Sequence, residues 1–519
     1  MADTLMQCLD WNPKEFCRLV GIVTSGSKAS LVPVRISKED ISFVRDEMLV
    51  LVEDVDEGRR YVGVFKGSTK KDLALDPATL PTSFDPEKTH MYTAPSMTSY
   101  VEVLGEITCS GIELSFSIPR PGSYVYAVVD GRRFQKILGI GEGLRIGVHK
   151  FSLMEVPLDP RALSYHIAVL GATGTGKSRL TKCIVEEVLR CTDYSVVIFD
   201  HTGIDYADKA RWSIDVDIVD ASKIVLDLDV IAQIIIEEVG LTGYHEEYVY
   251  GAIIEYAKKK FLEELNQNDK KFQNTSRFTE VDLEILLTLY RNASRKGLFT
   301  WSFHDFLRVL DEYLRNMGAR DHTSKKLKLL ITTRLGRRFF ENYLNGRRIV
   351  VEDVAKYLME KPKRLVVVDL SSEVEYIAKR GVVYQFMKIL WDEIWSNRGI
   401  PKKVLAVIDE AHNYTCTHGC EPAKTIIART VREGRKWGFG VVLSTQRVID
   451  LAPEIRGNIN TVFFSRLQSS GDYNELRNWL EGVQYLEYTL SMLTSREFFF
   501  AGLGNPLRKP LLVRVRDVK

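Results

Sequence analysis

One short glycine-rich stretch constrains this chain more than any other segment. It fits the pattern G-x-x-x-x-G-K-[ST] at every position, and its residues are Gly171, Ala172, Thr173, Gly174, Thr175, Gly176, Lys177 and Ser178. The apolar run His166–Leu170 precedes it and the helix-compatible run Arg179–Leu189 follows it. This strand–loop–helix setting is the one that a phosphate-binding loop requires. The alternative interpretation is a chance glycine-rich turn.

Each residue type in this loop has a chemical task. Glycines let the backbone bend so that its N–H groups surround phosphates at the start of a helix. We expect Lys177 to reach the β- and γ-phosphates and the Ser178 hydroxyl to bind Mg²⁺. The sequence therefore predicts ATP and Mg²⁺ as ligands.

A second motif is an apolar strand that ends in two carboxylates, Val404–Ile408 followed by Asp409 and Glu410. Asp409 is predicted to hold Mg²⁺, as the Walker B aspartate does. Glu410 is predicted to polarise a water molecule toward the γ-phosphate, which makes the protein a hydrolase and not a kinase. The alternative is that both acids only cap the segment that begins at Ala411.

Two further groups complete the predicted site. Gln446 follows the strand Gly440–Ser444 at the edge where α/β sheets bind ligands, so it can sense the γ-phosphate. A turn or cap amide is the alternative for Gln446. Arginines 429, 432 and 435 recur every three residues, and one could enter a neighbouring subunit's ATP site as an arginine finger. We expect Gly434 to interrupt the helix and leave Arg435 at a loop tip, although a solvated basic helix face is also open.

The order of strand and helix patterns indicates the fold class. Apolar strands alternate with helical segments after Leu158, which predicts an α/β, RecA-like P-loop core with a parallel-type central sheet. We place this core at 156–227 and 345–500, an inserted helical subdomain at 228–344, and a C-terminal strand extension at 501–519. The remaining residues, 1–155, contain short strands that predict a small β-barrel.

The predicted barrel contains one further expected strand and one long stretch without a strand pattern. Glu113–Ile118 alternates apolar and polar residues and is expected to be a strand. The stretch Thr69–Ser99 contains four prolines and has no clear period, so it is expected to be a long loop or an insertion within the barrel domain.

Composition sets the limits on partners and location. The formal net charge of +2 among 519 residues neither supports nor excludes DNA, because a local basic surface would be enough to bind it. No apolar run approaches the ~18 residues that span a bilayer, and the N-terminus lacks the apolar region of a signal peptide, so we expect a cytoplasmic protein without a membrane partner.

The scattered cysteines do not form a disulfide framework. A zinc site at His412, Cys416, His418 and Cys420 stays open, although their spacing matches no common zinc module.

With these motifs together, the chain resembles the HerA branch of the HerA/FtsK group of translocases over most of its length. The resemblance rests on the phosphate-binding loop with its lead-in and on further blocks, namely Pro119–Gly122, Asp409–His412, Arg432–Lys436 and Ser444–Arg447. Two stretches depart from the family pattern: Phe199–Tyr206, where relatives usually have a Gly-Glu-Tyr ending, and the His/Cys-rich loop after Glu410. Both the repair enzyme itself and a specialised paralogue therefore stay open.

The resemblance implies a specific function. It implies a homohexamer with ATP sites between subunits, double-stranded DNA in the central channel, and a NurA-type nuclease partner in the processing of DNA double-strand breaks. It also implies that Lys177, Asp409, Glu410 and Gln446 keep the roles given above and that Arg435 is the preferred finger, with Arg432 still open.

Two alternatives belong to other classes: a conjugation- or secretion-type pumping ATPase, and a scaffold whose assembly nucleotide controls. The DNA-contacting residues are not identified by the sequence. Lys325, Lys326, Arg337 and Arg338 are candidates, but ordinary surface of the helical insertion is the simpler interpretation.

Overall fold

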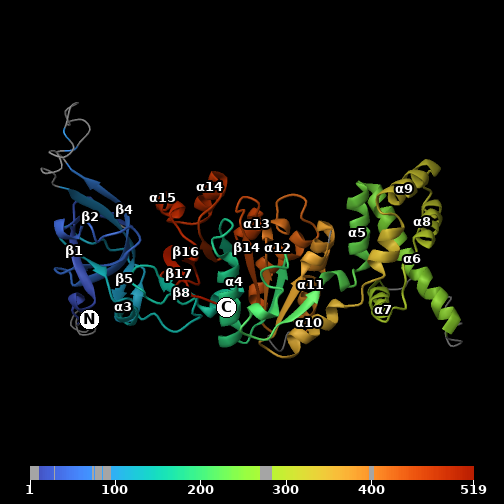
Figure 1. Ribbon diagram of the computed structural model, residues 1–519, viewed down its shortest axis with the longest axis horizontal. Coiled ribbons are helices and arrows are strands. Elements are labelled where there is room, and N and C mark those ends of the chain that lie inside the picture. Colours follow the sequence, from blue (N-terminus) through green and yellow to red (C-terminus); the bar gives the residue numbers. More distant parts are fainter. Residues whose placement is uncertain are drawn as a thin grey trace. The chain divides into compact units, whose positions relative to one another are not determined.

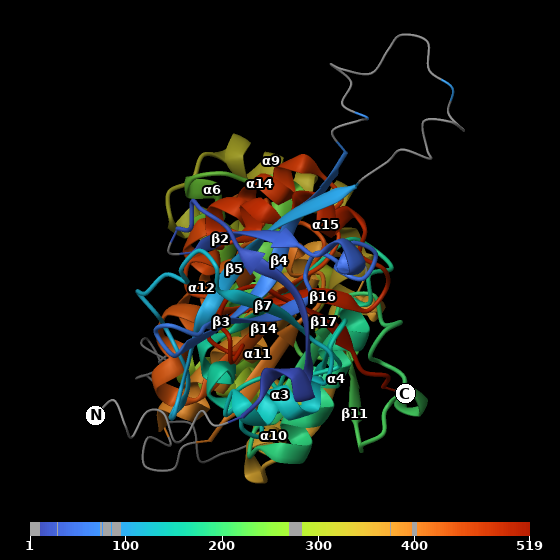
Figure 2. The same cartoon turned by 90° about the vertical axis from the view of Figure 1, so that its left-hand side faces the viewer.

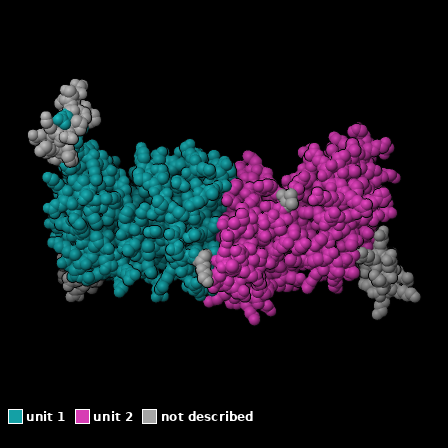
Figure 3. Space-filling model, in the orientation of Figure 1, with its two compact units in different colours: residues 1–192, 441–519 teal, residues 193–440 magenta. Residues whose placement is uncertain are grey.

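The computed structural model of the chain describes residues 11–28, 30–72, 75, 85, 95–268, 283–373, 375–396 and 402–518; of the side chains at 262–268 nothing is stated. The chain, coloured along its sequence in Figure 1, forms two compact units, residues 1–192 with 441–519 and residues 193–440 (Figure 3). The four-part division predicted from the sequence stays a prediction.

The N-terminal part of the first unit is an antiparallel β-barrel (Figure 2). Its hydrogen-bonded order is β2-β1-β7-β3-β4-β5-β6, and the pairing of β2 with β5 closes it. Val20, Val50, Phe65 and Val101 are among the side chains that fill its core. The strands are β1 (Cys17–Val23), β2 (Leu31–Ile36), β3 (Leu49–Asp54), β4 (Arg59–Lys71), β5 (Ser96–Thr108), β6 (Gly111–Glu113) and β7 (Tyr124–Val128).

The predicted strand Glu113–Ile118 is wrong, because β6 ends at Glu113. Its polar residues face the barrel: Ser115 Oγ donates to Glu106 Oε2 at 2.6 Å, and Ser117 Oγ lies 2.9 Å from the Tyr61 hydroxyl. The apolar residue Phe116 is therefore left 98% exposed. Side-chain hydrogen bonds have replaced strand pairing here.

The prediction of one loop over Thr69–Ser99 is also wrong at both ends, since β4 continues to Lys71 and β5 begins at Ser96. Pairing of these long strands, with Lys71 opposite Ser96, extends the hairpin outward. Most of the intervening stretch lies outside the described residues.

The remaining part of the first unit carries one group of strands and the helix after the phosphate-binding loop. Strand β9 pairs in parallel with β14 and β15, while β16, β17 and β8 follow as antiparallel neighbours. The strands are β8 (Gly147–His149), β9 (Ile167–Leu170), β15 (Thr461–Phe464), β16 (Glu497–Gly502) and β17 (Leu511–Val515). The helices are α3 (Gly131–Ile137), α4 (Lys177–Cys191), α13 (Pro453–Arg456), α14 (Ser470–Trp479) and α15 (Glu487–Ser491).

The second unit contains a parallel group of strands in the order β11-β12-β10-β13. These are β10 (Ser195–Asp200), β11 (Asp217–Asp220), β12 (Leu365–Asp369) and β13 (Val404–Ile408). Strand β14 (Phe439–Thr445) begins in this unit and ends in the other. Every residue of β10 and β13 is buried, as expected for strands covered on both faces. The predicted fold class, an α/β P-loop chain with a parallel-type sheet, an N-terminal barrel and a helical insertion, is confirmed.

The helices of the second unit form two groups. Helices α10 (Val351–Glu360), α11 (Tyr376–Ser396) and α12 (Ala423–Glu433) accompany the strands, and α11 packs against both others. The helical insertion contains α5 (Leu228–Val239), α6 (Tyr244–Asn268), α7 (Leu283–Arg295), α8 (Phe303–Asn316), α9 (Asp321–Arg334) and the π-helical turn η9 (Arg338–Leu344). Its core is aromatic: the Tyr256 and Trp301 rings stack at 4.9 Å, and Phe306 stacks on Phe340. Residues 269–282 of the insertion lie outside the described residues.

Within the described part of the chain, no helix has both the length and the apolar character needed to cross a bilayer.

Candidate functional site

The phosphate-binding loop joins buried strand β9 to helix α4 in the first unit. Gly174 and Gly176 have φ of +79° and +96°, a conformation that residues with a Cβ rarely adopt. Thr175 Oγ1 donates to the Ala172 carbonyl at 2.8 Å, which closes the loop on itself. Lys177 is buried, and its Nζ donates to the same carbonyl at 3.4 Å. The lysine is thus folded back over the loop that it is predicted to serve.

Backbone bonds hold the loop to the strands beside it. The Gly171 N–H donates to the Thr445 carbonyl at 3.2 Å, and the Ala172 N–H donates to the Arg466 carbonyl at 2.7 Å. A Cβ on Gly171 would lie 2.7 Å from Thr175 Oγ1, so this position requires glycine. The loop is therefore fixed to the ends of β14 and β15, the two strands that flank β9.

Gln446 lies against the phosphate-binding loop. Thr173 Oγ1 donates to Gln446 Oε1 at 2.9 Å. The sequence placed Gln446 only at the correct edge of the sheet, and the structure adds the loop residue that it contacts. An amide in this position is able to respond to what the loop binds.

The second unit presents Asp409 and Glu410 at the end of β13. Burial, together with the carboxylates of Glu410, Asp200 and Asp205, raises the pKa of Asp409 to about 8. Such a group of acids favours a bound cation, which would offset the repulsion between them. The role of Asp409 in holding Mg²⁺ stays a prediction. Among the described residues, however, no group of three or more His, Cys, Asp and Glu side chains is placed to hold a metal ion.

Glu410 has an unusual backbone conformation, with φ +44° and ψ +49°. Its buried Oε2 makes no hydrogen bond and lies 3.3 Å from His412 Nδ1. A left-handed conformation at a residue with a Cβ costs free energy and is found most often at functional sites. The short 3₁₀ turn η11 (Ala411–Asn413) follows, and the Asn413 N–H donates to the Glu410 carbonyl at 3.0 Å.

The loop after β10 was noted in the sequence only as a departure from the family pattern. The buried Asp200 carboxylate accepts hydrogen bonds from the backbone N–H groups of Thr202, Gly203, Tyr206 and Ala207. His201 Nδ1 lies 2.7 Å from the Tyr414 hydroxyl, and burial lowers the pKa of His201 to about 4. The loop is thus built around Asp200 and contacts the segment that follows Glu410. An aspartate at the end of an apolar strand was the available signal.

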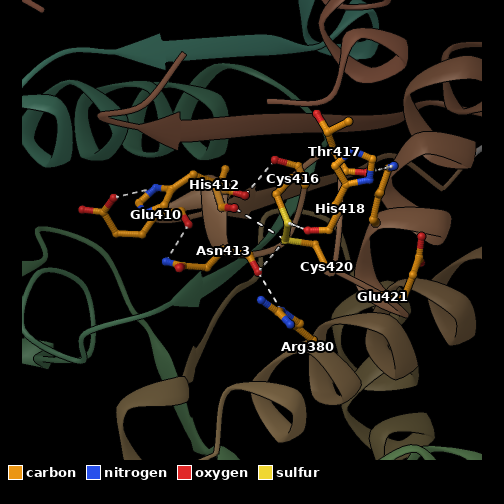
Figure 4. The surroundings of a disulfide bond; sticks show 12 residues. Arg380, Glu410, His412, Asn413, Cys416, Thr417, His418, Cys420 and Glu421 are labelled. Atoms are coloured by element: carbon orange, nitrogen blue, oxygen red, sulfur yellow. Dashed lines mark hydrogen bonds and ion pairs between the residues drawn. A yellow bond between two sulfur atoms is a disulfide. The ribbon is translucent and has the colours of Figure 1, made fainter. Parts of the chain in front are cut away.

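The His/Cys-rich loop after Glu410 contains a disulfide between Cys416 and Cys420 (Figure 4). This excludes both thiolates as zinc ligands while the bond is present. The disulfide was not predicted, because bonds within so short a loop give no framework pattern along the sequence. Cys420 Sγ lies 3.3 Å from the Asn413 carbonyl oxygen, so the bond lies beside the turn that follows Glu410. Arg380 Nε donates to the same carbonyl at 2.9 Å.

The structure corrects the predicted surroundings of Arg435. Gly434 does not make a loop tip: α12 ends at Glu433 and passes directly into a 3₁₀ turn, η12 (Gly434–Trp437). Glycine is needed there because an added Cβ would lie 2.5 Å from the Phe439 carbonyl oxygen. Arg435 is exposed on this turn, and Arg432 is exposed on α12. The role of either arginine as a finger stays a prediction.

The four candidate DNA-contacting residues are all exposed on the helical insertion, Lys325 and Lys326 on α9 and Arg337 and Arg338 beyond it. Arg337 forms an ion pair with Glu341.

Comparison with known proteins shows which family the chain is similar to. Residues 144–390 match the family model described as "Helicase HerA, central domain". Over this segment the chain is similar to the HerA family. It is 26% identical to the DNA double-strand break repair helicase HerA of Pyrococcus furiosus, over 81% of this chain and 77% of the relative. Its identity to the HerA of Sulfurisphaera tokodaii is 25%, over 72% of this chain and 69% of that protein.

Solved structures of lower similarity include VirB4 of Thermoanaerobacter pseudethanolicus, with a TM-score of 0.49, 14% identity, and coverage of 73% of this chain and 97% of that one. The plasmid coupling protein TrwB in complex with ADP and Mg²⁺ has a TM-score of 0.46 and 16% identity, covering 76% of this chain and 93% of that one. The HerA family match includes the phosphate-binding loop and the Asp200 loop and ends before Asp409.

Proposed function

We propose that this HerA-type chain hydrolyses ATP to drive movement along double-stranded DNA, in the repair of DNA double-strand breaks. The observation that carries the proposal is the hydrogen bond between Thr173 and Gln446. It links the phosphate-binding loop to the end of a neighbouring strand, as a protein needs if the γ-phosphate is to change its conformation. The proposal that the protein moves along DNA rests on the similarity to HerA repair helicases over most of the chain.

The chain's own residues divide the chemistry. The loop residues 171–178 bind the phosphates, with Lys177 on the β- and γ-phosphates. Ser178 and Asp409 hold Mg²⁺, which neutralises charge on the phosphates when bound. Glu410 accepts a proton from the attacking water, and the His412 imidazole beside it fixes the position of its carboxylate. Gln446 reports the loss of the γ-phosphate to the strand behind it.

The proposed assembly is a homohexameric ring around the duplex. In it Arg435, exposed on η12, enters the ATP site of the neighbouring subunit and stabilises the charge of the transition state. A NurA-type nuclease is the proposed partner, and the N-terminal barrel is its proposed docking region.

Two other functions compete with this one. A pumping ATPase of the conjugation or secretion type would have protein or nucleoprotein as its cargo. A scaffold would bind ATP without turnover, and the adjacent acids Asp409 and Glu410 argue against it because a scaffold has no need of a base beside the metal ligand.

The test is steady-state ATP turnover with linear duplex DNA, single-stranded DNA or no DNA. We expect duplex DNA to raise turnover, and the effect to fall steeply between roughly 50 and 200 mM salt because phosphate contacts release counterions. A scaffold would show no turnover in any condition. An ATP turnover rate that is the same with and without DNA at every salt concentration would favour the pumping ATPase.

A further inference from the structure

Arg496 is the residue whose conformation the proposed function leaves unexplained. It precedes β16 and has a φ of +70°, a left-handed conformation that is costly for any residue with a Cβ. Glycine would adopt this conformation without strain. A strained arginine at a ligand-binding edge is a reason to look for a function of its side chain.

The backbone of Arg496 lies against the phosphate-binding loop. Its N–H donates to the Thr175 carbonyl at 2.8 Å, and a Cβ on Gly176 would lie 3.3 Å from the same nitrogen. Strand β15 runs parallel to β9 and antiparallel to β16, so the end of β9 and the start of β16 share one edge of the sheet. Arg496 is thus fixed beside the residues that carry the phosphates.

The side chain of Arg496 joins a second arginine through one shared carboxylate. Arg496 Nη1 forms an ion pair with Asp517 Oδ1, and Arg179 Nη1 lies 3.7 Å from the same oxygen. Arg179 lies in the first turn of α4, which contains no acidic residue. Because a cation is unfavourable at the positive end of a helix, this position calls for an anion.

Asp517 is held in place by its neighbour in the chain. Arg516 Nη2 donates to Glu187 Oε1 at 2.8 Å, and Arg516 Nε lies 3.1 Å from Cys183 Sγ, both on α4. The Asp517 carboxylate itself is 77% exposed. Exposed ion pairs are weak, so a more highly charged oxyanion is able to displace this carboxylate.

We propose that Arg496 and Arg179 form a second phosphate-binding wall of the nucleotide site, and that Asp517 is an exchangeable counter-ion that occupies it when nucleotide is absent. The ligand is the phosphate chain of a nucleoside diphosphate or triphosphate. This inference rests on the proposed function of the phosphate-binding loop, and it adds positioning residues that neither sequence motif contains.

The test measures the Kd of fluorescently labelled ADP and GDP by titration. Arg496→Gly removes the guanidinium, keeps the backbone N–H, and folds without strain at this φ, which thermal melting checks. We expect it to weaken the binding of both nucleotides roughly ten- to hundredfold, as the loss of a charged hydrogen bond does. Arg496→Lys should restore part of the affinity. Asp517→Asn should bind both nucleotides more tightly, because the competing carboxylate is gone.

The matched control is Arg508→Gly, since Arg508 is also an arginine with a left-handed backbone, at a φ of +66°, and it is exposed beyond the other end of β16. It should leave both Kd values unchanged. Lys177→Ala, measured in parallel, tests the loop itself. If Lys177→Ala abolishes binding and Arg496→Gly does not weaken it, the second wall is wrong and the proposed function stands. A loss confined to ADP would overturn the assignment to phosphate, and unchanged or weaker binding by Asp517→Asn would overturn the counter-ion role.

Discussion

At the scale of single residues, Glu410 has the central role in the proposed hydrolysis, because it is the base that accepts a proton from water. Glu410→Gln removes the base while the phosphate-binding loop and Asp409 remain, so we expect ATP binding to persist and turnover to fall roughly 10²–10⁴-fold. Binding of labelled ATP and steady-state turnover, measured on the same preparation, check this. His412→Ala is the partner variant and should lower turnover less, because His412 only positions the carboxylate. Loss of ATP binding in Glu410→Gln would make Glu410 structural.

A buried histidine gives a pH prediction at the same scale. Burial lowers the pKa of His149 to about 4; His149 Nε2 lies 2.9 Å from the Glu47 carbonyl oxygen and Nδ1 lies 2.9 Å from Ser152 Oγ. Since the unfolded chain binds this proton at about pH 6.5, acidification from 6.5 to 4 should cost up to ~3 kcal/mol of unfolding free energy. Denaturant unfolding at several pH values measures it. His149→Gln should remove this part of the pH dependence, and an unchanged slope would contradict the assignment.

The site residues differ in how far the sequence could predict them. Lys177, Asp409 and Glu410 belong to motifs in which spacing along the chain fixes the chemistry. Gln446 was predicted from its place after a strand, but its contact with Thr173 depends on how β14 and β9 pair. Arg496 and Asp517 were missed, because strand pairing brings them to the loop from more than 300 positions away in the sequence.

At the scale of elements, the turn after β13 links the disulfide to the base. Asn413 Nδ2 donates to the Glu410 carbonyl at 3.2 Å, and Cys420 Sγ lies against the Asn413 carbonyl. Replacing both Cys416 and Cys420 by serine should loosen this turn, so turnover should fall while ATP affinity, set by the phosphate-binding loop, stays the same. Turnover and binding assays with and without a dithiol reductant measure both.

The exposed free Cys191 offers the matched control, because Cys191→Ser removes a thiol outside this turn. That variant should keep normal turnover and should still respond to the reductant. If the double serine variant also keeps normal turnover, the disulfide has no part in positioning Glu410.

The elements themselves were largely predictable. Apolar runs such as β10 and β13 follow the expected pattern because strands buried on both faces leave an uninterrupted apolar signal. The prediction of a strand over Glu113–Ile118 was wrong because the alternation of apolar and polar residues indicates only which side chains share a face. It does not tell whether a partner strand exists, and here Ser115 and Ser117 bind Glu106 instead. The prediction of a loop tip at Gly434 was wrong for a related reason. Glycine is required there because the Phe439 carbonyl lies too close for a Cβ, and not because the chain forms a loop.

At the scale of the whole molecule, the proposed ring makes a prediction about two subunits. Arg435→Ala should bind ATP but lose roughly 10³–10⁵-fold in turnover if this arginine completes the neighbouring site. Mixing it with Glu410→Gln should restore part of the activity, because some interfaces then have an intact arginine and an intact base. Turnover after confirmed subunit exchange measures this. No recovery would move the finger to Arg432, and a second failure would remove a trans-acting arginine from the mechanism.

The central claim, that ATP hydrolysis drives this chain along duplex DNA, is tested most directly by displacement of a triplex-forming oligonucleotide from linear duplex DNA. A protein that moves along the duplex must remove the third strand. We predict displacement with ATP and Mg²⁺, none with a non-hydrolysable ATP analogue, and none by Glu410→Gln although that variant still binds ATP. A preparation that hydrolyses ATP while bound to the same duplex, yet never displaces the third strand, would contradict the account.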